Sequence, residues 1–260
     1  MGKLEGECAL ISGGGTGIGK EIALLFAVEG ANIAICGRRM EKLQDTKKAV
    51  EALGRKCEAV SGDIGVEADV VRIVSHTVKC LGAVTILVNN ASVVGQVAPL
   101  VETDLEEWND AYRINITGTM LCMREALKYM IPARKGNIVN VSSITGRMGY
   151  KNRASYGSSK WAMNGLTQIA AKEVGELGIR VNAICPGPIM TERLEGSIVR
   201  QARARNMTAA ELEKEWGEDC ALKRLATAEE CARVTLFLAC DDSAGMTGQA
   251  LNVTAGAFMS

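Results

Sequence analysis

The stretch that decides the fold is Cys8-Ala9-Leu10-Ile11-Ser12-Gly13-Gly14-Gly15-Thr16-Gly17-Ile18-Gly19, an apolar run that ends in a glycine-rich loop. The run Cys8–Ser12 predicts a buried strand, and the pattern over Gly19–Glu29 predicts a helix. Glycines let backbone N–H groups approach a phosphate, and a helix N-terminus supplies partial positive charge. The loop therefore indicates a nucleotide site, and a tight turn without a ligand is the alternative.

Two familiar phosphate-binding patterns do not fit this loop. No frame gives the dinucleotide spacing G-x-G-x-x-G. Gly14 to Lys20 matches G-x-x-x-x-G-K, but Glu21 stands where a P-loop needs a Ser or Thr for magnesium. A P-loop phosphotransferase is therefore only a distant alternative. The remaining spacing, G-x-x-x-G-x-G, is formed by Gly13, Gly17 and Gly19.

Short apolar runs alternate with helical patterns along the whole chain. The predicted strands are Cys8–Ser12, Asn32–Cys36, Lys56–Val60, Thr85–Asn89, Asn137–Val141, Arg180–Cys185 and Gln249–Val253. The predicted helices are Gly19–Glu29, Met40–Leu53, Glu67–Leu81, Leu105–Met130, Ala154–Leu177 and Ala228–Leu238, the last with a capping-box pair, Thr227 and Glu230. We therefore expect one α/β domain over residues 1–260, with a Rossmann-type, doubly wound parallel sheet of about seven strands and helices on both faces. The charged stretch Pro186–Leu222 contains no strand pattern, and we expect residues 191–222 to form a substrate lid.

Composition narrows the class of protein. Lys plus Arg equals Asp plus Glu, at 30 each, so no global field draws the chain onto nucleic acid or an anionic membrane. No signal-peptide core or membrane-spanning run is present. The nine cysteines are scattered and His76 is the single histidine, so we expect free buried thiols, no metal and a cytoplasmic setting.

Tyr156-Gly157-Ser158-Ser159-Lys160 lies near the start of the helical pattern Ala154–Leu177. A spacing of four places the Tyr and Lys side chains on one helix face, one turn apart. A free tyrosine, with a pKa of about 10, is a weak acid near neutrality, and a neighbouring ammonium favours its phenolate form. The pair therefore indicates a proton-transfer group, and a polar pair on a helix surface is the alternative.

Polar or turn-forming residues also follow three of the predicted strands. They are Ser142-Ser143, Asn89-Asn90 and Pro186-Gly187-Pro188. The carboxyl ends of parallel strands meet at one edge of a sheet, where the glycine-rich loop also lies. We expect these groups to converge there on one site.

With these motifs in this order, the sequence resembles the short-chain dehydrogenase/reductase family over essentially the whole chain. The motifs are S-G-G-G-T-G-I-G at 12–19, D-I at 63–64, N-N-A-S at 89–92, Asn115 in a helix, S-S at 142–143, Y-G-S-S-K at 156–160 and P-G-P-I-M-T at 186–191. Three residues depart from the family's commonest pattern: Ser12 for Thr, Ser92 for Gly and Ala255 for Gly. Ser92 is the change that could alter backbone geometry beside the cofactor, and we expect it to be tolerated.

The resemblance implies a nicotinamide-dependent oxidoreductase in which Tyr156 is the acid in reduction and the base in oxidation. Lys160 is then the residue that makes Tyr156 more acidic and holds the nicotinamide ribose. Ser143 orients and polarises the carbonyl, with Ser142 as its structural neighbour. Asn115 resembles the helix residue whose backbone holds a water in a proton relay. Hydride transfer from nicotinamide C4 accompanies protonation by Tyr156, and no metal is required.

The end of the second predicted strand favours NADP(H) over NAD(H). NAD-preferring members of the family carry an acidic residue there, whereas this chain continues with Gly37-Arg38-Arg39. The Arg38 guanidinium can pair with a 2′-phosphate, although both arginines could simply begin the next helix. Asp63 and Ile64 resemble the pair that flanks the adenine ring. The other cofactor-binding residues implied by the resemblance are Ser12, Gly13, Thr16, Gly17, Ile18, Gly19, Asn90, Tyr156, Lys160, Pro186, Gly187, Ile189 and Thr191.

The substrate is indicated less strongly. The polar segment Gly146–Arg153 favours a small hydroxylated or charged substrate, such as a sugar or polyol. A 3-oxoacyl thioester reductase, acting on acyl carrier protein or CoA, is the second hypothesis, and a non-catalytic nucleotide-binding scaffold is the third. An arginine of the lid could bind an acidic substrate, but its mixed charge favours a solvated pair of helices. By resemblance, the helices Leu105–Met130 and Ala154–Leu177 pack against a partner's helices in a homodimer or homotetramer.

Overall fold

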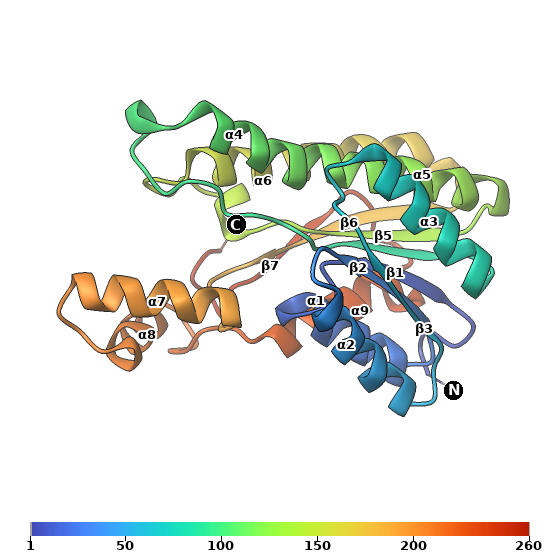
Figure 1. The fold of residues 1–260 in the computed structure, drawn as a ribbon, viewed down its shortest axis with the longest axis horizontal. Helices are drawn as coiled ribbons and strands as arrows, with labels where there is room; N and C mark the ends of the chain where they lie inside the picture. Colours follow the sequence, from blue (N-terminus) through green and yellow to red (C-terminus); the bar gives the residue numbers. More distant parts are fainter. Residues whose placement is uncertain (1, 260) are drawn as a thin grey trace.

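The computed structural model describes residues 2–259, apart from the side chains of Arg193, Ser197, Arg200, Gln201 and Ala204. The described residues form one sheet of seven parallel strands in the order β3-β2-β1-β4-β5-β6-β7 (Figure 1). The strands are β1 (Cys8–Ser12), β2 (Asn32–Gly37), β3 (Cys57–Ser61), β4 (Ile86–Asn89), β5 (Gly136–Val141), β6 (Ile179–Pro186) and β7 (Ala250–Val253). The predicted doubly wound sheet is confirmed, and every predicted strand end lies within one residue of the observed one.

Helices cover both faces of the sheet (Figure 1). One face carries α1 (Gly17–Val28), α2 (Met40–Ala52) and α9 (Ala228–Ala239), and the other carries α3 (Glu67–Leu81), α4 (Leu105–Tyr112), α5 (Thr119–Ala133) and α6 (Ala154–Val174). A buried apolar cluster lies on each side: Phe26 packs with Cys231 in the first, and Val74 packs with Met130 in the second. Because both faces of the strands are buried, the strands read in the sequence as continuous apolar runs.

The predicted helix Leu105–Met130 is wrong at its centre. A π-helical turn, Arg113–Gly118, separates α4 from α5. The extra residue in a π-turn changes the direction of the backbone groups, and such turns are frequent at functional sites. Asn115, predicted as a site residue, lies within this turn.

The segment after β6 forms two helices, α7 (Glu192–Ala204) and α8 (Ala209–Glu218), which lie apart from the two helical layers (Figure 1). They share a small apolar cluster of their own, centred on Ile198, Ala202 and Leu212. Thr208 begins α8 with a capping box, in which its side chain accepts from the Glu211 N–H. The described part of this segment is therefore a helical pair with a charged exterior.

Two further sequence features bear on the class of protein. Of the nine cysteines, all are free and all are buried except Cys80, which is exposed. Among the helices of residues 2–259, none combines the length and hydrophobicity that a membrane crossing requires.

Candidate active site

The loop between β1 and α1 is joined to the end of β4 by hydrogen bonds. The side-chain amide of Asn90 donates to the carbonyl oxygens of Ser12 and Gly13, at 3.0 and 3.1 Å. The Ser12 hydroxyl accepts from the backbone N–H groups of Asn90 and Ala91, at 3.0 and 3.1 Å. Two segments distant in sequence thus form one wall at the carboxyl edge of the sheet.

Glycines shape this loop for close backbone approach. Gly17, the first residue of α1, has a φ of +53°. A Cβ at Gly19 would lie 2.3 Å from the Gly13 carbonyl oxygen, so a side chain does not fit there. Within the described residues, no side-chain hydrogen bond caps α1 at Thr16, and the first turn of this helix contains no acidic residue. Its N–H groups are therefore suited to an anion. Ile18 is half-buried and packs against the core.

The two arginines after β2 lie on the surface beside this loop. Both Arg38 and Arg39 are exposed. An Arg39 guanidinium nitrogen donates to the Thr16 hydroxyl at 3.4 Å, which draws the start of α2 toward the glycine loop. Within the described part of residues 2–259, neither arginine is in an ion pair, so both guanidinium groups can bind an anion.

Asp63 is engaged in a contact that the sequence did not suggest. Its carboxylate accepts from Arg113 at 3.1 Å and from the Gly65 N–H at 2.8 Å. Arg113 also donates to Asp110 at 2.7 Å. The hydrogen bond with Asp110 raises the pKa of Arg113, Asp63 adds to this effect, and burial opposes it. The neighbouring Ile64 is buried, whereas Asp63 is half-buried and paired with Arg113. The two residues predicted to flank the adenine therefore lie in different environments.

Tyr156 and Lys160 lie one turn apart near the start of α6, as predicted. The Lys160 ammonium is 5.6 Å from the centroid of the Tyr156 ring. Lys160 is only 1% exposed, and its Nζ donates to the Val141 carbonyl oxygen at 2.7 Å, at the end of β5. Tyr156 itself is half-buried. The structure thus fixes the ammonium beside the phenol.

Ser142 and Ser143 occupy the same end of β5 with different roles. The Ser142 hydroxyl donates to the Lys160 carbonyl oxygen at 3.1 Å and ties the strand to α6. Ser143 begins a short 3-10 turn, Ile144–Gly146, and its hydroxyl oxygen accepts from the Thr145 N–H at 3.2 Å. Because that bond uses only the oxygen, the Ser143 hydroxyl proton can still be donated.

Asn115 is fully buried, and its side chain lies against α6. Its side chain accepts from the Val93 N–H and donates to the Val93 carbonyl, both at 2.9 Å, and it donates to Ser159 at 3.0 Å. Its backbone carbonyl accepts from the Thr119 hydroxyl at 2.9 Å. Asn115 thereby connects the π-turn to α6 and to the segment after β4.

The predicted cofactor residues 186–191 lead from the end of β6 toward α7. The Gly187 N–H donates to the Val253 carbonyl at 3.0 Å, and Ile189 is buried and forms an isolated bridge with Ala226. Thr191 lies against Gly17, since a Cβ added at Gly17 would be 3.2 Å from the Thr191 methyl group. Pro186, the last residue of β6, is buried. This segment therefore leaves β6 at the same carboxyl edge and approaches the glycine loop from the side of β6 and β7.

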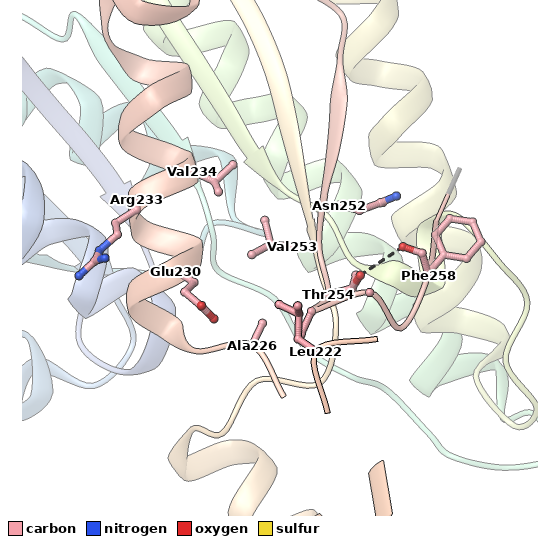
Figure 2. A pocket seen from close by; sticks show the side chains of 11 residues that line it. Leu222, Ala226, Glu230, Arg233, Val234, Asn252, Val253, Thr254 and Phe258 are labelled. Atoms are coloured by element: carbon pink, nitrogen blue, oxygen red, sulfur yellow. Dashed lines mark hydrogen bonds between the residues drawn. The ribbon is translucent and has the colours of Figure 1, made fainter. Parts of the chain in front are cut away.

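Two cavities lie near this edge, outside the predicted catalytic group. The first, of about 460 Å³, is lined by α9 and β7 residues such as Glu230, Arg233 and Asn252 (Figure 2). The second, of about 410 Å³, is lined by Gly146 and Arg147 together with residues of α6 and Phe258. The second cavity thus shares two residues with the predicted substrate segment Gly146–Arg153.

Comparison with known sequences gives one consistent class. A family model described as enoyl-(acyl carrier protein) reductase matches residues 13–257. An uncharacterized oxidoreductase of Thermotoga maritima is 37% identical over 97% of this chain and 97% of its own length. A 3-oxoacyl-(acyl-carrier-protein) reductase, FabG, of the same organism is 35% identical over 98% of both chains.

Solved structures agree in fold and differ in cofactor. A xylitol dehydrogenase with bound NAD⁺ superimposes with a TM-score of 0.92 at 30% identity, covering 98% of this chain and all of the other. An actinorhodin polyketide ketoreductase variant with NADPH superimposes with a TM-score of 0.93 at 30% identity, covering 99% of both chains. Both kinds of nicotinamide cofactor therefore occur among proteins similar to this one.

Proposed function

Because this chain belongs to the short-chain dehydrogenase/reductase family, and is an oxidoreductase that acts on CH–OH or carbonyl groups with a nicotinamide cofactor, we propose that it moves a hydride between NADP(H) and a small polar carbonyl or alcohol. We assign proton transfer to Tyr156. The observation that carries this proposal is the Lys160 ammonium, buried and held 5.6 Å from the Tyr156 ring.

The residues around the glycine loop fit a dinucleotide. A side chain at Gly19 would collide with the Gly13 carbonyl, so the loop of residues 13–19 leaves its backbone accessible to a ligand. We call this loop the nucleotide cradle. The uncapped N-terminus of α1 supports binding of the pyrophosphate. We assign Asn90, Ile189 and Thr191 to the walls of this cradle, with support from the contacts of Asn90 and Thr191 to the loop, and Asp63 with Ile64 would flank the adenine. When bound, the nicotinamide supplies or accepts the hydride.

Proton transfer follows from the positions of three side chains. In the direction of reduction, the Tyr156 hydroxyl gives its proton to the carbonyl oxygen of the substrate. The Ser143 hydroxyl donates a hydrogen bond to the same oxygen and orients it. We assign to the buried Lys160 ammonium the stabilisation of the negative charge left on the phenol oxygen, because opposite charges attract more strongly in a site with little water. To the Asn115 backbone carbonyl we assign the water that returns the proton, as the family resemblance implies.

The preference for NADP(H) is supported by the charges after β2. The strand ends at Gly37, so no carboxylate stands at this position to repel a 2′-phosphate. The exposed guanidinium of Arg38 and that of Arg39, beside Thr16, are both available for charge-assisted hydrogen bonds.

We assign the role of a substrate lid to residues 191–222, within a single catalytic domain. Lys42 of α2 lies 3.8 Å from Glu192 at the start of α7, which brings this segment close to the nucleotide cradle. Arg205 is paired with Glu215 through two bonds of 2.9 Å, so this lid arginine is occupied within the lid. That pairing favours a helical lid of mixed charge. It gives less support to the alternative, in which a lid arginine binds an acidic substrate. The side chains of Arg193 and Arg200 lie outside the described residues.

A small sugar, polyol or other hydroxy compound is the favoured substrate. Gly146 and Arg147 of the polar segment 146–153 line the second cavity, which supports a polar ligand. The second candidate, a 3-oxoacyl thioester reductase, is favoured by the FabG relative and by the description of the matching family. A non-catalytic scaffold has no counterpart among the proteins compared above, which are named as oxidoreductases.

A homodimer or homotetramer is supported by apolar side chains on α5 and α6. The exposed ones include Met120, Tyr129, Trp161 and Ile169. Exposed apolar groups that gather on neighbouring helices are typical of protein interfaces.

The direct test is a screen that follows NADPH absorbance over polar aldehydes, ketones and sugars, with 3-oxoacyl thioesters in the same series. We expect the polar small carbonyls to be reduced with NADPH as the better cofactor. Turnover confined to the acyl thioesters would establish the second candidate instead. No turnover with any carbonyl or alcohol would contradict the proposal.

A further inference from the structure

Three potential metal ligands meet on the outer side of the sheet, at the edge strand β3. Glu58 comes from β3, and His76 and Cys80 come from one face of α3. The His76 Nε2 atom is 3.2 Å from the Glu58 Oε2 atom and 3.5 Å from the Cys80 Sγ atom. All three ligand atoms lie within 4.8 Å of one another, and the described residues contain no other such group of three.

This cluster lies away from the nucleotide cradle. Because α3 runs antiparallel to the strands, its C-terminal turn lies at their amino ends, and the Cys8 thiol at the start of β1 donates to the Leu81 carbonyl at 3.3 Å. The cradle and Tyr156 lie at the opposite, carboxyl edge. The cluster is therefore independent of the proposed reaction.

Without a metal, the three side chains make one good polar contact and one weak one. A protonated Nε2 atom of His76 can donate to the Glu58 carboxylate, and the imidazolium form makes this contact an ion pair. The exposed Cys80 thiol is then in weak contact with the ring. A cation placed among the three ligand atoms would bind all of them at once.

Two of the three ligand separations match the coordination sphere of zinc. With Zn–N and Zn–O bonds of about 2.0–2.1 Å and a Zn–S bond of about 2.3 Å, tetrahedral angles separate N from O by about 3.3 Å and N from S by about 3.5 Å. The observed separations are 3.2 and 3.5 Å. Both elements hold their ligands on a firm base, because α3 buries Ile73, Val74 and Thr77 and Glu58 is paired in register with Ala34 in the sheet.

We propose that Glu58, His76 and Cys80 form a Zn²⁺ site whose fourth position is open to water. A carboxylate, a thiolate and a neutral imidazole give a charge of −2, which Zn²⁺ neutralises. The thiolate and the imidazole favour zinc over Mg²⁺ or Ca²⁺, which prefer oxygen ligands. Lys47 lies 4.0 Å from Glu58, but it is also 3.7 Å from Glu51 and can keep that partner when zinc is bound. Bound zinc would join the edge strand to α3 and stabilise this side of the sheet.

The test is a Zn²⁺ titration of the metal-free full-length chain by calorimetry, under a phosphine reductant that keeps the thiol free. We expect one equivalent to bind, together with a rise in melting temperature. Co²⁺ should give a near-ultraviolet thiolate-to-metal band that Cys80→Ser abolishes. Glu58→Gln, His76→Asn and Cys80→Ser should each weaken zinc binding by at least about tenfold, in line with the cost of disturbing metal sites.

Glu51→Gln is the matched control, because it removes a neighbouring carboxylate and leaves all three ligands in place. It should bind zinc like the parent chain. No binding at micromolar zinc, or equal binding by the parent, His76→Asn and Cys80→Ser, would overturn the proposal. NADPH binding should be the same in all these variants, so the result does not depend on the proposed catalytic function.

Discussion

Replacing Gly19 with alanine tests whether the β1–α1 loop is shaped for a dinucleotide. The added Cβ would lie 2.3 Å from the Gly13 carbonyl oxygen and 2.4 Å from the Asn90 side-chain nitrogen. Neither neighbour can move freely, because the first is backbone and the second is held by two hydrogen bonds. Overpacking of this kind costs about 1–3 kcal/mol of folding free energy. For a chain of this size, that corresponds to a melting temperature lower by roughly 3–10 °C.

The same displacement would move the backbone N–H groups to which we assign the pyrophosphate. A loss of about 1.4–2.8 kcal/mol of binding energy would weaken NADPH binding about tenfold to a hundredfold. Thermal unfolding and titration of NADPH fluorescence measure the two effects separately on the same protein.

Gly175→Ala is the matched control for this experiment. Gly175 has helical backbone angles, φ −60° and ψ −43°, and an added Cβ would meet nothing within 4 Å. Alanine should therefore stabilise the protein by about 0.5–1 kcal/mol through helix propensity alone and leave NADPH binding unchanged. If Gly19→Ala bound NADPH as tightly as Gly175→Ala did, the steric account of the cradle would be refuted.

Three further predictions concern the cofactor, the substrate and the dependence of stability on pH. Arg38→Ala should weaken NADPH binding about tenfold to a hundredfold, the cost of a charge-assisted hydrogen bond, and leave NADH binding nearly unchanged; equal losses in the two titrations would contradict the assignment. Ser143→Ala should lower kcat by roughly a hundredfold with little change in NADPH affinity, and an unchanged kcat in steady-state assays would remove Ser143 from the mechanism. The Arg224 guanidinium, and then the Thr227 backbone N–H, lower the pKa of Glu230 to about 2. Because this folded-state pKa lies below the ordinary value of about 4.3, the stabilisation is present above that value and is lost as the pH falls toward 2. Because glutamine can still accept from the Thr227 N–H, Glu230→Gln mainly removes the charge beside Arg224 and the helix N-terminus. It should therefore lower the free energy of unfolding by about 1 kcal/mol at pH 7, and denaturant melts should show that difference shrinking between pH 4.3 and 2. A difference that stayed constant over that range would contradict the attribution to the Glu230 charge.

The sheet could be predicted from the sequence because its strands are buried on both faces. Runs such as Cys8–Ser12 and Asn137–Val141 contain few interruptions, and glycine or asparagine marks their ends. The cap of α9 was also predictable, since Thr227 and Glu230 form the expected capping box in the structure. Local signals of this kind depend on residues that are close in sequence.

The features that the sequence did not predict depend on contacts between distant segments. The π-turn at Arg113–Gly118 was not predicted, because a single extra residue shifts the hydrophobic pattern of a helix only slightly. The pair of Asp63 and Arg113 joins residues 50 apart. A search for close cysteine spacings misses the cluster of Glu58, His76 and Cys80, because one of its ligands comes from the neighbouring strand. The burial of Lys160 was likewise invisible, since lysine is usually an exposed residue.

The central claim is that Tyr156 moves the proton, and turnover of Tyr156→Phe tests it most directly. Phenylalanine keeps the ring beside Lys160 and removes only the hydroxyl. With the best carbonyl substrate and saturating NADPH, we predict a rate lower by about 10²- to 10⁴-fold, the usual contribution of a general acid, and a far smaller change in NADPH affinity. Turnover equal to that of the parent enzyme would contradict the account.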